Sequence, residues 1–152
     1  MIWIFGDREY NIEGATSLAL NGTALEFAYQ RFNIARKKIA EGDTVIVTLT
    51  NFDRRWFFKP YPEAAITDES PTGNKKENKA IKLFRKYLDH KEIHQTYLID
   101  FLYNLYGLTE ELNLKTIIIP EFDDVKSFLD KNKDLFPLFN IVENLDDALG
   151  IR

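Results

Sequence analysis

Continuous apolar runs along the chain predict the strands of a buried sheet. The clearest lie at residues 2–5, 44–50 and 115–119, and the last two are rich in β-branched residues. Shorter runs at residues 17–20 and 138–142 predict two more strands. The runs are continuous rather than alternating in polarity, which is typical of strands covered on both faces of a parallel sheet.

Helical periodicity fills most of the intervals between these runs. Apolar residues spaced by three and four predict helices over about residues 25–39, 74–88, 93–105 and 123–131. The first begins with a capping-box pattern, and the third is apolar almost all round, which predicts a buried helix. We therefore expect a single α/β domain over residues 1–152, a three-layer α/β/α sandwich with a mainly parallel, flavodoxin-like sheet.

Two connections depart from the simplest form of this fold. Only residues 6–16 separate the first two strands, whereas a parallel crossover normally needs a dozen or more residues that include a helix. Residues 59–73 form the longest predicted loop, and loops of that length are usually functional or mobile.

Composition and charge narrow the class of protein. The 152 residues are 45% hydrophobic and 29% charged, which is ordinary for a folded domain. The absence of cysteine excludes disulfides, thiolate metal sites and cysteine nucleophiles. No run approaches the ~20 apolar residues of a membrane span, and the apolar start lacks the basic residues of a signal peptide. We expect a cytoplasmic protein without membrane association.

The net charge of −4 is unevenly distributed. Residues 110–152 hold ten acidic and five basic side chains, so the first part of the chain is nearly neutral. Because proteins that bind nucleic acids over a broad surface are usually basic, general binding to nucleic acid is not expected.

Three short motifs follow predicted strands. Gly6-Asp7 ends the first, Asn21-Gly22-Thr23 follows the second, and Thr50-Asn51-Phe52-Asp53 ends the third. They resemble the sequence blocks of SGNH/GDSL hydrolases, in which an apolar first strand ends in Gly-Asp-Ser. The resemblance implies an SGNH-like α/β sandwich, ester hydrolysis as the family activity, and an oxyanion faced by the Gly22 N–H and the Asn51 amide. The chain is also similar to a small group of phage-encoded SGNH-like proteins.

The chain departs from the family at the residues that carry catalysis. Arg8 stands where the family has its nucleophilic serine, and a guanidinium stays protonated and has no lone pair for attack. No histidine follows His94, whereas the family places Asp-x-x-His near its C-terminus. The third block lacks a glycine and has one residue inserted between Asn51 and Asp53. Since a Ser-His mechanism needs both nucleophile and base, the sequence predicts a catalytically impaired protein. The alternative is a non-enzymatic binding or assembly module that has kept the pocket.

The carboxyl ends of parallel strands meet at one edge of a sheet, where ligands bind. The polar residues expected at this edge are Asp7, Arg8, Asn21, Gly22, Asn51, Asp53, Arg54 and Arg55, with aromatic residues at 56–58 beside them. Arginine, amide donors and aromatic planes together suit a small anionic or sugar-like ligand, and no metal or cofactor is indicated. The structural alternative is that Arg8 pairs with Asp53 or Glu9 in place of a lost active site.

Two further patterns have both a functional and a structural interpretation. His90 and His94 share a helix face, which would suit a metal pair or a solvated junction between two helices. Four lysines within residues 75–86 line one face of a predicted helix, which would meet an acidic partner or phosphates, or would simply be solvated. The sequence leaves the oligomeric state open.

Overall fold

The main sheet is parallel throughout. The computed structural model describes residues 1–55, 57–58, 65–66 and 75–149. The main sheet contains β1 (Ile2–Gly6), β2 (Ala15–Ser17), β3 (Thr44–Leu49), β6 (Lys115–Pro120) and β7 (Asn140–Ile141). Its strand order is β2-β1-β3-β6-β7, and all neighbours pair in parallel. This is the doubly wound order of flavodoxin-like sheets, so the predicted fold class is confirmed. The short strands β4 (Phe57–Phe58) and β5 (Ala65–Ile66) form a separate antiparallel pair.

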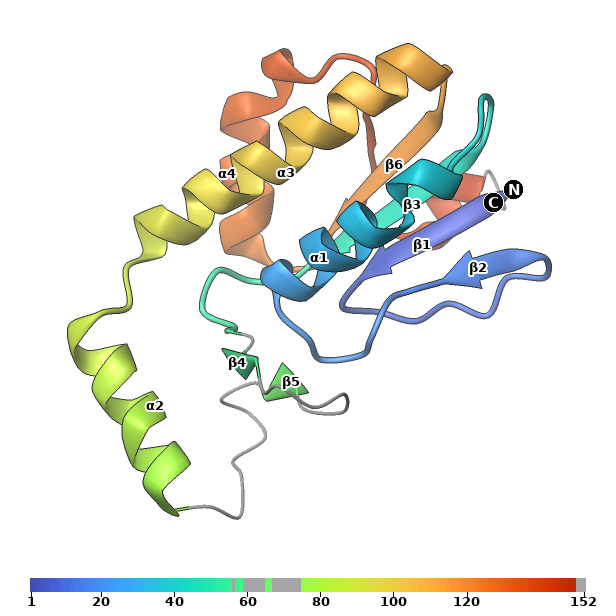
Figure 1. Cartoon of the computed structure of the whole chain (residues 1–152). Helices are drawn as coiled ribbons and strands as arrows, with labels where there is room; N and C mark the ends of the chain where they lie inside the picture. Colours follow the sequence, from blue (N-terminus) through green and yellow to red (C-terminus); the bar gives the residue numbers. More distant parts are fainter. Residues whose placement is uncertain (56, 59–64, 67–74, 150–152) are drawn as a thin grey trace.

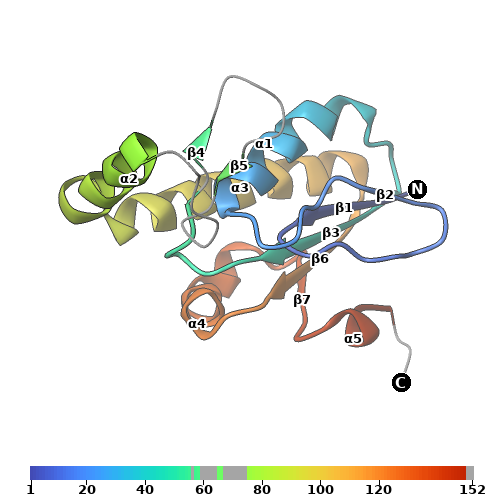
Figure 2. The ribbon, with the colours of Figure 1, turned by 90° about the horizontal axis from the view of Figure 1, so that it is seen from below.

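Helices connect the strands and cover the sheet. They are α1 (Leu25–Ala35), α2 (Lys75–Tyr87), α3 (Lys91–Leu112), α4 (Asp123–Asn132) and α5 (Leu145–Leu149), with 3₁₀ turns η1 (Arg36–Lys38) and η2 (Lys133–Leu135). Figure 2 shows α1 and α3 on one side of the sheet and α5 on the other, which gives three layers.

The two faces of the sheet are covered unequally. One face packs into a large cluster with α1, α3 and α4, and its strands contribute Trp3, Phe5, Val45, Val47, Leu49 and Ile118. The other face packs Ile46, Ile117 and Ile119 against Ala148 of α5. Burying one such side chain contributes roughly 1.5–3 kcal/mol, so the alternation of inward positions along β3 and β6 holds both layers in place.

The short connection between β1 and β2 explains the thin second layer. It contains no helix, and its side chains Tyr10 and Ile12 pack against the second face instead. The crossover is therefore pruned, and an irregular segment takes the place of a helix.

Three local predictions are wrong. The second strand covers residues 15–17 rather than 17–20, although the N–H groups of Leu18 and Leu20 still donate to carbonyls of β1. No side chain caps α1, because Ala24 occupies its N-cap position. Helix α3 extends to Leu112 and buries only one side, since polar residues such as Asp100 and Asn104 interrupt its apolar surface.

The predicted loop at residues 59–73 lies outside the described residues, apart from the two residues of β5. Among the described helices, none has the length and apolar character needed to cross a bilayer.

Candidate functional site

The site lies where β1, β3 and β6 end side by side, and Gly6 sets its geometry. Gly6 has φ +122°, a backbone conformation that favours glycine. A Cβ at this position would lie 2.1 Å from the carbonyl oxygen of Thr48, the residue that pairs with Gly6 in β3. The glycine of the Gly6-Asp7 motif is therefore required by the close approach of two strands, whatever chemistry follows it.

Asp7 is the buried acid of the site. It is 6% exposed, and its Oδ2 lies 3.2 Å from the Arg54 guanidinium. Burial raises the pKa of Asp7, whereas the Thr50 hydroxyl, Arg54 and the Thr48 hydroxyl oppose that rise. Its Oδ1 atom and the Thr50 Oγ1 atom are both buried without a hydrogen bond to the described residues. The edge thus holds a carboxylate whose ionisation is disfavoured.

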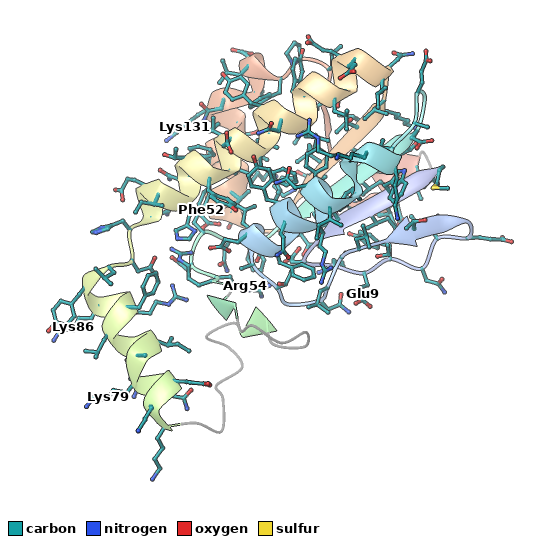
Figure 3. All side chains as sticks on the ribbon, in the orientation of Figure 1. Glu9, Phe52, Arg54, Lys79, Lys86 and Lys131 are labelled. Carbon is teal, nitrogen blue, oxygen red and sulfur yellow. The ribbon has the colours of Figure 1, made fainter. Side chains whose placement is uncertain are left out.

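A turn after β3 brings Arg54 to Asp7. The Asn51 side-chain oxygen accepts hydrogen bonds from the N–H groups of Asp53 and Arg54, at 3.1 and 3.0 Å. This closes the loop so that Arg54 lies beyond the end of β3 (Figure 3). Its guanidinium also lies 5.1 Å from the centre of the Phe122 ring. The Asn51 oxygen is thereby committed to the turn, and the Asp53 side chain is exposed.

Arg8 pairs with Glu121, not with Asp53 or Glu9 as the structural alternative predicted. Its Nε lies 2.9 Å from Glu121 Oε1, and its side chain is 58% exposed whereas that of Glu121 is 11% exposed. Its backbone N–H donates to Thr48 Oγ1 at 3.1 Å. The outer edge of the Arg8 guanidinium therefore faces solvent at the carboxyl edge of the sheet.

Glu121 and Tyr10 are the other two ionisable side chains near Asp7 and Arg8. Burial raises the pKa of Glu121, and the nearby charge of Asp7 raises it further, against the opposing effect of Arg8 and Arg54. Burial also raises the pKa of Tyr10, with Glu121 as the next cause. Two carboxyl groups with raised pKa values and two arginines thus lie together at the point where the strand order reverses, the usual ligand position in this sheet type.

The motif Asn21-Gly22-Thr23 makes hydrogen bonds to the segment that follows β1. The Asn21 side-chain oxygen accepts a hydrogen bond from the Glu9 N–H at 2.8 Å. The Gly22 N–H donates to the Asp7 carbonyl at 3.1 Å, with Gly22 at φ +75°. The donor that the family resemblance assigns to an oxyanion is therefore occupied by the chain itself.

A hollow of about 390 Å³ opens beside Glu121, at the carboxyl ends of β6 and β7. We call it the acidic hollow, because four of its lining residues are acidic: Glu121, Asp123, Asp130 and Glu143. Lys126 also lines it, with its Nζ 2.8 Å from a Glu143 carboxylate oxygen. Glu121 therefore belongs both to the Arg8 pair and to this hollow.

A second charged cluster anchors the start of α3. Arg55 is buried, with its Nε 2.8 Å from Asp89, and Arg85 lies 2.7 Å from the same carboxylate. His94 lies between Glu26 and Asp89, at 3.1 and 3.6 Å. Although burial raises the pKa of Asp89, its hydrogen bonds from Arg85 and Arg55 outweigh this and lower it. Arg55 thus has a structural role, away from the Asp7 carboxylate.

The metal-pair interpretation of His90 and His94 is not supported by their positions. His90 is the N-cap residue of α3, whereas His94 lies in the first turn between two carboxylates. Within the described ranges, no group of three or more potential metal ligands comes together. Of the aromatic residues expected beside the site, Trp56 lies outside the described residues.

The contacts of four residues at the site could not be predicted from the sequence. Glu121 follows Pro120, which predicts only the end of a strand, and its pairing with Arg8 depends on the order of β1, β3 and β6. Thr48 and Thr50 are indistinguishable in sequence from other β-branched residues of a buried strand. Tyr10, whose pKa is raised by burial and by the nearby Glu121, lies in the connection between the first two strands. The only notable feature of that connection in the sequence is its short length.

The sequence matches no family model, no curated protein and no solved structure to a degree that would indicate relationship.

Proposed function

We propose that this protein is a divergent SGNH-like protein that binds a small anionic or sugar-like ligand at the carboxyl edge of its sheet, without Ser-His ester hydrolysis. The observation that carries the proposal is Arg8, at the position where the family has its nucleophile. One edge of its guanidinium is held by Glu121, and the other faces solvent. A cytoplasmic location and a phage origin, both suggested by the sequence, belong to the same proposal.

The chemistry of Arg8 suits an anion. A guanidinium held at Nε is oriented, and its terminal nitrogens offer parallel N–H donors that match carboxylate and phosphate oxygens. Arg54 is held in a largely buried pair with Asp7, whereas Arg8 is 58% exposed, so the guanidinium within reach of a ligand is that of Arg8. Glu121 would accept hydrogen bonds from hydroxyl groups of the same ligand.

The state of the oxyanion donors argues against conventional catalysis. The Gly22 N–H, which the resemblance assigns to the oxyanion, is already bonded to the Asp7 carbonyl. Stabilisation of a tetrahedral intermediate needs donors that are free and aimed at the developing oxyanion. With Arg8 in place of the nucleophile and the Gly22 N–H occupied, the nucleophile and one of the two expected oxyanion donors are absent from this conformation.

Binding is tested with inorganic phosphate and glucuronate as probes and glucose as the neutral control. Isothermal titration of the wild type, of Arg8→Gln and of Arg36→Gln compares the edge with a matched arginine outside the site. We expect phosphate or glucuronate to bind the wild type and Arg36→Gln, and to bind Arg8→Gln about tenfold more weakly or not at all. Equal binding to all three proteins would refute the proposal.

A second candidate function is hydrolysis by the two carboxyl groups. It is favoured by one observation, the raised pKa values of Asp7 and Glu121, because acid–base sites pair carboxyl groups in this manner. It predicts turnover of p-nitrophenyl acetate or of a p-nitrophenyl glycoside that depends on pH and is lost in Glu121→Gln. Absence of turnover between about pH 4 and 9 would remove this candidate and leave the binding proposal intact.

A further inference from the structure

Helix α2 exposes most of its side chains and half-buries the others, which are Glu77, Asn78, Ile81, Phe84 and Arg85. None of its residues is buried. Figures 1 and 2 show it standing away from the main sheet, beyond the carboxyl ends of the strands. An ion pair between Arg85 and Asp89, which follows the helix, fixes its last turn to the cluster around Arg55. The helix is therefore held in position at its last turn, and its lysines at positions 75, 79, 82 and 86 are exposed.

The charge of α2 is opposite to that of the rest of the chain. It contains six of the 20 lysines and arginines and one of the 24 acidic residues, so it carries +5 whereas the whole chain carries −4. Lys75, Lys79, Lys82 and Lys86 follow one another at spacings of four, three and four, which places them on one stripe. Figure 3 shows Lys79 and Lys86 on this helix, pointing away from the sheet.

Apolar side chains lie next to this stripe. Leu83 is 48% exposed and Tyr87 is 62% exposed, and the chain continues with Leu88 at 65%. Solvation of the lysines does not account for three large apolar side chains exposed beside them. A rim of charges around exposed aromatic and aliphatic groups is the composition of a protein–protein interface.

The complementary surface is present on the same chain. The acidic hollow offers Asp123 and Asp130, together with Glu143 in its pair with Lys126, beside the apolar Ile141 and Val142. It opens at the carboxyl ends of β6 and β7, and α2 projects beyond that same end of the sheet. We propose that α2 of one copy docks against the acidic hollow of a second copy, in a closed two-fold dimer that makes this contact twice.

This partner explains the mixed character of the helix better than a nucleic acid does. A phosphate backbone would engage the lysines and leave Leu83 and Leu88 exposed, whereas the hollow presents acids and apolar residues together. Because the contact is partly electrostatic, the dimer should weaken with salt, as the Debye length shortens from about 10 Å at 0.1 M to about 3 Å at 1 M.

The test uses sedimentation equilibrium of the whole chain, with two charge-reversed variants. One carries Lys79→Glu and Lys82→Glu, and the other carries Asp130→Lys and Glu143→Lys. We expect the wild type to dimerise at low salt, and each variant alone to have a Kd at least about tenfold higher. An equimolar mixture of the two should form a heterodimer, because both of its contacts are again between opposite charges. Lys37→Glu with Lys38→Glu, on η1, is the matched control and should dimerise like the wild type.

Three results would overturn the proposal. The first is a wild type that stays monomeric up to about 100 μM at low salt. The second is a dimer that survives reversal of the α2 lysines in a variant with a native circular dichroism spectrum. The third is a monomeric wild type that binds a poly(A) probe through Lys79 and Lys82, since the stripe would then serve nucleic acid.

Discussion

Removal of the charge of Arg54 should destabilise the fold mainly through Asp7. Arg54→Met keeps the aliphatic stem and deletes the guanidinium, which lies 3.2 Å from Asp7 and 5.1 Å from the Phe122 ring. Asp7 has a side chain only 3% exposed, so the variant leaves a buried carboxylate without its cation. Breaking a buried pair in this manner typically costs about 3–5 kcal/mol, and we expect about 3 kcal/mol at pH 7.5 because Arg54 itself is 16% exposed.

The cost should depend on pH with a definite sign. The folded-state pKa of Asp7 is raised above its ordinary 3.8, so its protonated form favours the fold. That contribution is complete below the unfolded-state pKa and is lost as the pH rises through the folded-state pKa. Loss of Arg54 raises the folded-state pKa further. The destabilisation by Arg54→Met should therefore be largest at pH 7.5 and clearly smaller at pH 5.

The assay is urea unfolding of the wild type, Arg54→Met, Asp7→Asn and the double variant at both pH values. Asparagine keeps the shape of Asp7 and removes its charge. The double variant should therefore lose less than the sum of the single variants, with a coupling of about 1.5 kcal/mol at pH 7.5. A cost of Arg54→Met that is equal at both pH values and unchanged in the Asp7→Asn background would refute this reasoning.

Three further predictions concern the same strands. Gly6→Ala should cost about 3 kcal/mol or more in urea unfolding, because its Cβ would lie 2.1 Å from a Thr48 oxygen; Gly14→Ala, with nothing within 4 Å, controls for the strain of positive φ and should cost less. Asp43 accepts bonds from the Met1 ammonium and the Trp3 indole, which with the Ala40 N–H lower its pKa to about 2. The ionised Asp43 should therefore add about 2 kcal/mol to the free energy of unfolding above about pH 4, and this contribution should be lost toward pH 2. If the stability of Asp43→Asn falls as much as that of the wild type over this range, the prediction is contradicted. Arg8→Ser should show no labelling by a fluorophosphonate probe, since no histidine contacts Arg8 among the described residues; heat-sensitive labelling would contradict this.

The sheet could be predicted because burial on both faces leaves a strong mark on sequence. Strands β3 and β6 are β-branched at almost every position, and such runs have few other stable uses. Strand β2 was misplaced because it pairs over only three residues and has no buried residue, so hydrophobicity does not mark it. The end of α3 was placed too early because its last turns bury a polar residue, which interrupts the apolar pattern. That residue is Thr109, whose hydroxyl is hydrogen-bonded to that of Thr116.

The candidate site could be predicted as a location and not as a set of contacts. Parallel strands bring Asp7 and Arg54 to one edge, so topology alone predicts their neighbourhood. Which carboxylate binds which arginine depends on the reach of side chains across β3, and periodicity carries no such information. The sequence therefore paired Arg8 with Asp53, whereas the structure pairs it with Glu121.

The two ion pairs at this edge have different physical roles. The Asp7–Arg54 pair is largely buried, so it holds the end of β1 to the loop after β3. The Arg8–Glu121 pair has a cation that is 58% exposed, and exposed pairs contribute about 0–1 kcal/mol. Its partner Glu121 is 11% exposed, so the pair contributes less to stability than the buried Asp7–Arg54 pair, although Arg8 still favours the ionised form of Glu121. The oriented guanidinium open to solvent is the feature on which the proposal of an anionic ligand rests.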